Sequence, residues 1–135
     1  MPMLEWDDSL NVNVEKIDTQ HKELVNMVND LFDAMTGGAN DLVATDLVGR
    51  LKEYALHHFA TEEKYMEEYK YPDAQDHIPK HDDFRNKAAQ IEADCNSGNF
   101  AISMDLLNFL SDWLVTHING TDKKFGEFLN KAEVH

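Results

Sequence analysis

Apolar residues recur along most of this chain at alternating spacings of three and four, and four long segments share the pattern. The segments cover residues 19–35, 41–69, 76–96 and a fourth stretch that begins between residues 99 and 103. A helix turns about 100° per residue, so these spacings place the apolar side chains on one face. Four such helices with short connections predict an all-α fold, an up-down-up-down antiparallel four-helix bundle.

Residues that start or stop helices lie at the ends of these segments. Asp18 is suited to cap the first helix and Asn40 or Asp41 the second, while Gly37-Gly38 is suited to end the first. Pro79 fits the third helix only if it lies in the first turn, where backbone donors have no helical partner.

The N-terminal segment has a different pattern. Leu10, Val12 and Val14 alternate with polar neighbours, which is typical of an extended segment with one covered face. We therefore expect an arm over residues 1–17 that lies across the end of the bundle, and a helical bundle over residues 18–131. Together they form one domain, residues 1–135, because a chain of this length can bury a single core.

Composition excludes several classes of partner. The formal net charge of -14 disfavours nucleic acid and anionic membrane surfaces, which require clustered lysine and arginine. Cys95 is the only cysteine, so an intrachain disulfide is impossible and a reducing compartment is expected. No secretory signal and no apolar stretch of membrane-spanning length is visible. These features predict a soluble, cytoplasmic domain.

Histidines occupy apolar positions in all four segments. The residues concerned, together with one carboxylate, are His21, His58, Glu62, His77, His81 and His117. Buried imidazoles and carboxylates need partners, and in an up-down-up-down bundle all six lie near the same end. Taken singly, each histidine has a simpler interpretation as a hydrogen-bonded core residue. The joint pattern favours a metal, whereas His57 and His135 lie off this face and are not expected to bind.

A second carboxylate, Asp122, follows His117 by five residues, which is about 140° around an ideal helix. Taken alone, Asp122 would be an N-cap of the last helical piece, residues 122–131. It reaches the histidines only if Gly120 lets the backbone bulge or unwind.

The ligand types narrow the choice of metal. Five imidazoles and two carboxylates are too many for one tetrahedral zinc, and calcium or magnesium would prefer oxygen throughout. Mixed nitrogen and carboxylate ligands suit iron or manganese, and their number indicates two ions. If both carboxylates and one solvent oxygen bridge the ions, the histidines divide three and two. One ion then keeps an open position where a small molecule can bind.

The motifs IDTQH (17–21), HHFATEE (57–63), DHIPKH (76–81) and WLVTHINGTD (113–122) resemble those of hemerythrins, especially the bacterial members. The resemblance implies an oxo- or hydroxo-bridged di-iron centre. In it, His77, His81 and His117 hold the saturated iron, His21 and His58 hold the open iron, and Glu62 and Asp122 bridge the two. The resemblance also implies an apolar dioxygen pocket over the open iron, formed by Leu24, Phe59, Trp113, Leu114 and Ile118.

The activity implied by this resemblance is reversible dioxygen binding, as a carrier, store or sensor, with no catalytic residue. The pocket positions offer no acid, base or positive charge that would assist O–O cleavage. The Glu-x-x-His repeats of ferritin-like di-iron enzymes are also absent. Two alternatives remain open: a di-iron enzyme with oxidase, peroxidase or nitric-oxide-handling activity, and a structural bundle whose metal only aids folding. A sensor would also need a signalling partner, attached to this domain or separate from it.

Overall fold

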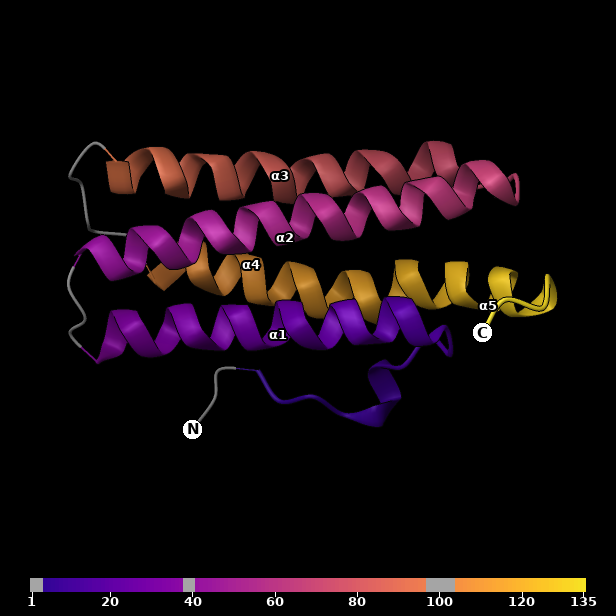
Figure 1. Ribbon diagram of the computed structural model, residues 1–135, viewed down its shortest axis with the longest axis horizontal. Helices are drawn as coiled ribbons and strands as arrows, with labels where there is room; N and C mark the ends of the chain where they lie inside the picture. Colours follow the sequence, from indigo (N-terminus) through magenta and orange to yellow (C-terminus); the bar gives the residue numbers. More distant parts are fainter. Residues whose placement is uncertain (1–3, 38–40, 97–103) are drawn as a thin grey trace.

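The computed structural model describes residues 4–37, 41–96 and 104–135, and within these residues all regular structure is helical. The helices of the bundle are α1 (Glu15–Thr36), α2 (Asp41–Glu68), α3 (Ala74–Asn96), α4 (Met104–Thr116), the π-helix η2 (His117–Asp122) and α5 (Lys123–Lys131). These helices form four rods, the fourth of which consists of α4, η2 and α5. Figure 1 shows that the rods lie side by side and alternate in direction. The predicted up-down-up-down bundle is therefore confirmed. The expected start of the fourth helix lies outside the described residues, as do Gly38 and Asn40.

The first helix begins at Glu15, four residues earlier than the pattern predicted. Asp18 does not cap it. The Asp18 carboxylate instead reaches back and accepts hydrogen bonds from the backbone N–H groups of Val12, at 2.7 Å, and Asn13, at 3.2 Å. Asn13 has a φ of 65°, a turn conformation that asparagine tolerates well. The arm therefore turns directly into α1, and its last residue is Val14 rather than residue 17.

The arm contains one short 3-10 helix, η1 (Asp8–Leu10), and is fixed to the bundle along its length. Its alternating apolar side chains are buried, as predicted. Near its start, the Asn29 side-chain amide exchanges two hydrogen bonds with the Leu4 backbone, both at 2.8 Å. Near its end, the Asn130 amide donates to the carbonyl of Asn13 at 2.9 Å. In Figure 1 the arm accordingly runs along the side of α1, and the expectation that it lies across the end of the bundle was wrong, because the contacts to Asn29 hold it beside the helix.

The arm meets α5 at Gly126. A Cβ atom placed on Gly126 would lie 2.5 Å from the carbonyl oxygen of Val12 and 2.8 Å from its Cβ. Both distances are shorter than van der Waals contact, so only glycine permits this approach of the two backbones.

Two apolar clusters fill the bundle. The larger cluster contains Leu10 of the arm and fifteen buried side chains from all four rods, among them Leu24, Ala55, Phe59, Phe84, Leu110 and Leu114. The smaller lies at the arm end and contains Val12, Val14, Ile17, Met66, Tyr71, Phe125 and Leu129. Along each rod, the predicted polar residues fall mainly between members of the two clusters. The polar residues thus form a layer between two dry regions.

The buried face of α2 passes through Leu51, His58 and Glu62, as their helical spacing predicts. Tyr54, Tyr65 and Tyr69 have the same spacing as these residues but are only half-buried, while the neighbouring Ala55 and Met66 are buried. Tyrosine hydroxyls stay wet at the edge of the core, so smaller or more flexible side chains occupy its centre.

Pro79 lies in the second turn of α3 and not in the first, since the helix begins at Ala74. A proline there leaves the carbonyl of Gln75 without its helical partner. Gln75 and Pro79 are both exposed, so this side of the helix faces water, which can supply the missing hydrogen bond. The prediction was wrong because solvent exposure lowers the cost of the missing bond.

None of the described helices combines the length and the apolar character needed to cross a bilayer.

Candidate metal centre

The structure brings together all seven side chains that the sequence singled out as metal ligands. They are contributed by all four rods and none is more than 4% exposed: His21, His58, Glu62, His77, His81, His117 and Asp122. His57 and His135, which were not expected to take part, are exposed.

The Glu62 carboxylate divides its two oxygens between two sets of histidines. Oε2 lies 3.4 Å from Nε2 of His21 and 3.0 Å from Nε2 of His58. Oε1 lies 3.3 Å from Nε2 of His77 and 3.1 Å from Nε2 of His81. One carboxylate therefore faces both halves of the site.

Asp122 repeats this division from the opposite rod. Oδ2 lies 3.0 Å from Nε2 of His21, while Oδ1 lies 3.0 Å from Nε2 of His77 and 3.2 Å from Nε2 of His117. The result is two overlapping groups whose ligand atoms lie within 4.8 Å of one another, and the two carboxylates belong to both. We call the group with His77, His81 and His117 the three-histidine half, and the group with His21 and His58 the two-histidine half.

The π-helix η2 accounts for the position of Asp122. Its hydrogen bonds join residues five apart, so the wider turn brings residue i+5 back to the face of residue i. His117 and Asp122 are the first and last residues of η2 and consequently point into the same site. The predicted bulge is present. However, a Cβ on Gly120 would meet no atom within 4 Å and its φ is not in the left-handed region, so the final conformation does not require glycine.

The hydrogen bonding of these residues fits a metal site. Within the part of the chain that the structure describes, buried ring nitrogens of His21, His77 and His117, Oε2 of Glu62 and both carboxylate oxygens of Asp122 have no hydrogen-bond partner. Several of these atoms are only 3.0 to 3.4 Å apart, so their angles and not their distances prevent hydrogen bonding. Unsatisfied buried polar atoms are costly. Atoms that converge without bonding one another are suited to bind cations placed between them.

The electrostatics are consistent with a cation site. Burial lowers the pKa of His21, but the Asp122 and Glu62 carboxylates outweigh burial and raise it to about 9. The same opposing effects raise the pKa of His77 to about 9. Burial raises the pKa of Glu62 but the charge of His58 and contacts to histidines hold it well below its usual value. Without metal, the two carboxylates therefore retain protons on nearby imidazoles, and metal binding must displace these protons.

The raised pKa values of His21 and His77 make the stability of the metal-free protein, obtained by chelation, depend on pH. The pKa values of His21 and His77 are raised from 6.5 to about 9 in the folded state, so their protonation stabilises the fold fully below pH 6.5. We expect the free energy of unfolding of the metal-free protein to fall as the pH rises from 6.5 to 9. Urea unfolding at pH 6.5, 8 and 9 measures this, and a stability that is constant or rises over the range would contradict it.

A buried amide that the sequence analysis missed orients His58. Nδ1 of His58 lies 2.7 Å from Oε1 of Gln20, so the ring donates there and its Nε2 faces Glu62. The Gln20 amide in turn donates to the hydroxyl of Thr61 at 3.3 Å. Gln20 precedes His21 and lies beside the apolar face of α1, where an uncharged polar residue gives little signal of its role.

Aromatic rings pack against the histidines of the three-histidine half. Phe59 stacks on His81 at 4.1 Å with an angle of 14°, and Trp113 stacks on His117 at 4.4 Å with an angle of 12°. Phe59 also contacts His58, with centroids 5.6 Å apart, so it borders both halves. The five positions expected to form a dioxygen pocket all belong to the larger core cluster or pack against it: Leu24, Phe59, Trp113, Leu114 and Ile118. Trp113 alone among them is only half-buried.

Comparison with known proteins gives a consistent result. Residues 12–129 match the family model described as the hemerythrin HHE cation binding domain. The chain is 34% identical over 127 residues to a bacteriohemerythrin of Stenotrophomonas maltophilia, covering 94% of this chain and 82% of that protein. It is 31% identical to a bacteriohemerythrin of Methylococcus capsulatus, covering 96% of this chain and 99% of that protein.

Among solved structures, a wild-type hemerythrin superposes with a TM-score of 0.87 at 31% identity, over 94% of this chain and 98% of that one. The matched region contains every residue of the polar layer. Fold, sequence and the convergent histidines and carboxylates agree, and the chain belongs to the hemerythrin family.

Proposed function

We propose that this protein binds dioxygen reversibly at a non-heme di-iron centre held by the seven buried side chains. The three-histidine half would hold one iron through His77, His81 and His117, and the two-histidine half would hold the other through His21 and His58. Glu62 and Asp122 would bridge them, each giving one oxygen to each half, together with a solvent oxygen as oxo or hydroxo bridge. Family membership supports the di-iron centre, and the two overlapping groups of possible ligands support this assignment of ligands to the two irons.

The observation that carries the proposal is the unequal division of donors. One group contains five residues and the other four, and both include the same two carboxylates. With both carboxylates shared, the two-histidine half has one protein ligand fewer. A missing protein ligand leaves a coordination position for a small molecule.

When bound, two reduced irons supply the electrons that reversible dioxygen binding requires. The protein's own contribution is the surroundings of the site. Leu24, Leu114 and Ile118 are each at most 2% exposed, and Phe59 contacts both His58, with ring centroids 5.6 Å apart, and His81. These side chains exclude water and carry no titratable group, so they limit proton delivery to the bound molecule. Slow proton delivery favours release of the ligand unchanged over its conversion.

Two measurements test the proposal. Metal analysis of the purified protein should give two irons per chain. The anaerobically reduced protein should then form a coloured adduct with dioxygen, and purging with inert gas should restore the reduced spectrum over repeated cycles.

Other outcomes would point to the alternatives. A single irreversible oxidation that consumes dioxygen and leaves a product would identify an enzyme. One zinc per chain, or two irons that never form an adduct, would leave only a structural role for the metal.

A further inference from the structure

The outer nitrogens, Nδ1, of His21, His77 and His81 have no hydrogen-bond partner among the described residues, and of these only that of His81 has a described carboxylate within 4.0 Å. Nε2 of His81 faces Oε1 of Glu62 at 3.1 Å, while Nδ1 on the other side of the ring is buried with no hydrogen-bond partner among the described residues. The nearest carboxylate oxygen is Oε2 of Glu63, at 3.7 Å. This distance exceeds a hydrogen bond, for which about 3.2 Å is the upper limit, by roughly half an ångström.

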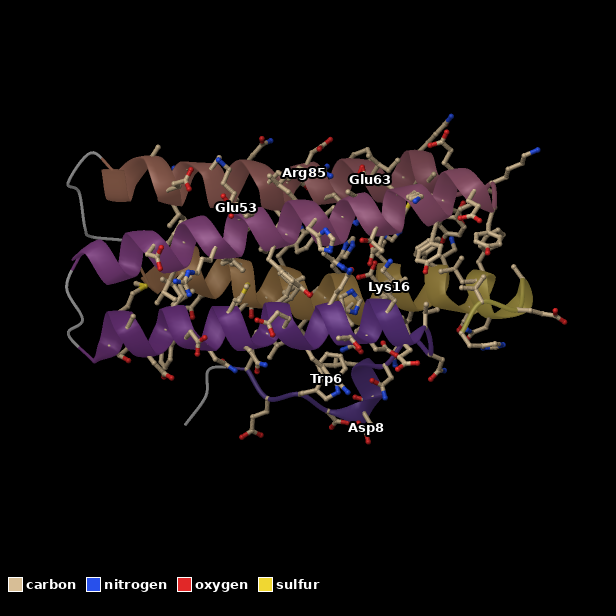
Figure 2. The ribbon with its side chains drawn as sticks, viewed as in Figure 1. Trp6, Asp8, Lys16, Glu53, Glu63 and Arg85 are labelled. Atoms are coloured by element: carbon tan, nitrogen blue, oxygen red, sulfur yellow. The ribbon has the colours of Figure 1, made fainter. Side chains whose placement is uncertain are left out.

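Glu63 is held beside His81 by an arginine from the next helix. Nη2 of Arg85 lies 2.6 Å from Oε2 of Glu63, and its Nη1 lies 2.7 Å from Oδ1 of Asp82. The guanidinium also lies over the ring of Phe59 at 5.2 Å, and Phe59 stacks on His81. Figure 2 shows Arg85 and Glu63 close together on α3 and α2. Because Glu63 and Arg85 are only 23% and 24% exposed, this pair is a fixed group and not a mobile surface contact.

The two halves of the site therefore differ outside the ligands. His58, in the two-histidine half, donates to the neutral amide of Gln20. His81, in the three-histidine half, faces a carboxylate paired with a guanidinium. A charged acceptor increases the electron donation of an imidazole to a metal more strongly than a neutral one. This asymmetry would favour the oxidised state of an iron held by the three-histidine half.

We propose that Glu63, fixed by Arg85, is a positioning residue for His81. In the iron-loaded protein the Glu63 carboxylate accepts the Nδ1–H of His81, which directs Nε2 to the metal and places negative charge behind the ring. A ligating histidine almost always donates its second N–H to a carboxylate, a carbonyl or water, and Glu63 is the nearest charged candidate. This inference rests on the proposed di-iron centre.

The test is Glu63→Gln in the iron-loaded protein. Glutamine retains an oxygen that can accept the Nδ1–H but removes the charge. We expect a more positive midpoint potential, a shifted ligand-to-iron absorption band, and release of iron to a chelator that is roughly 10–100-fold faster. None of these readouts depends on dioxygen binding.

The matched control is Glu92→Gln. Glu92 forms the other described ion pair between α2 and α3 that involves lysine or arginine, with Lys52 at 3.0 Å and similar exposure. It is not among the candidate ligand groups or their ion pairs. Thermal melts of both metal-free variants measure the structural cost of losing one interhelical ion pair. The proposal is supported if the two metal-free variants melt at similar temperatures and only Glu63→Gln shifts the midpoint potential of the iron-loaded protein.

Identical potentials, spectra and iron-release rates in the two variants would overturn it. That result is distinct from failure of the proposed function, because the unmodified protein is analysed first for two irons and a reversible adduct. If the unmodified protein holds no iron, the proposed function itself fails.

Discussion

Glu62→Gln is expected to abolish binding of both metal ions. Glu62 gives one oxygen to each half of the site, at 3.0 Å from Nε2 of His58 and 3.1 Å from Nε2 of His81. Glutamine has the same shape but replaces one oxygen with an amide nitrogen, which is a hydrogen-bond donor and not a ligand. Iron content should fall from two per chain to near zero after gel filtration. The affinity should fall by more than the roughly 10–100-fold that follows loss of an outer partner.

Glu67→Gln is a suitable control for this experiment, since Glu67 lies on the same helix and is exposed. It should retain both irons. Retention of one iron per chain by Glu62→Gln would show that the carboxylate serves only one half, and the proposed bridging role would be wrong.

Gly126→Ala is expected to have the largest effect on stability away from the metal centre. The added methyl group would lie 2.5 Å from the carbonyl oxygen of Val12, a backbone atom that moves only if the arm moves. Overpacking of this kind costs about 1–3 kcal/mol, and detachment of the arm would expose Val12 and Val14. Urea unfolding of the metal-free protein measures the cost, and limited proteolysis within residues 4–14 measures detachment.

Gly120→Ala provides the matched control, because its added methyl group meets no atom within 4 Å. We expect it to be neutral, or more stable by about 0.4–1 kcal/mol through reduced freedom of the unfolded chain. Equal stability of Gly126→Ala and Gly120→Ala would mean that the backbones of the arm and α5 have room for a methyl group between them.

The sequence predicted the bundle and the members of the polar layer other than Asp122 because both depend on local periodicity. His58 with Glu62 and His77 with His81 are i,i+4 pairs, which a helix places on one face whatever surrounds it. The convergence of four rods then followed from their alternating direction.

Features that depend on contacts between distant residues could not be predicted in this way. Asp18 is a residue type that often caps helices, but here its carboxylate accepts hydrogen bonds from the backbone of the arm. Glu63 belongs to an acidic run that is typical of a solvated face, and only its position opposite Arg85 gives it a partner. The one available signal was weak: Arg85 follows His81 by four residues and so lies on the same side of α3.

The π-helix also indicates how the spacing of two ligands along the sequence can change. A π turn is an α turn that contains one additional residue. His117 and Asp122 are thus geometrically an i,i+4 pair with a single insertion, of the same kind as the pairs on α2 and α3. A chain shortened by one residue at the exposed Asn119 would present the same two side chains from a regular helix. Helix α5 would keep its register to Asp122, so the ligand set would tolerate this deletion.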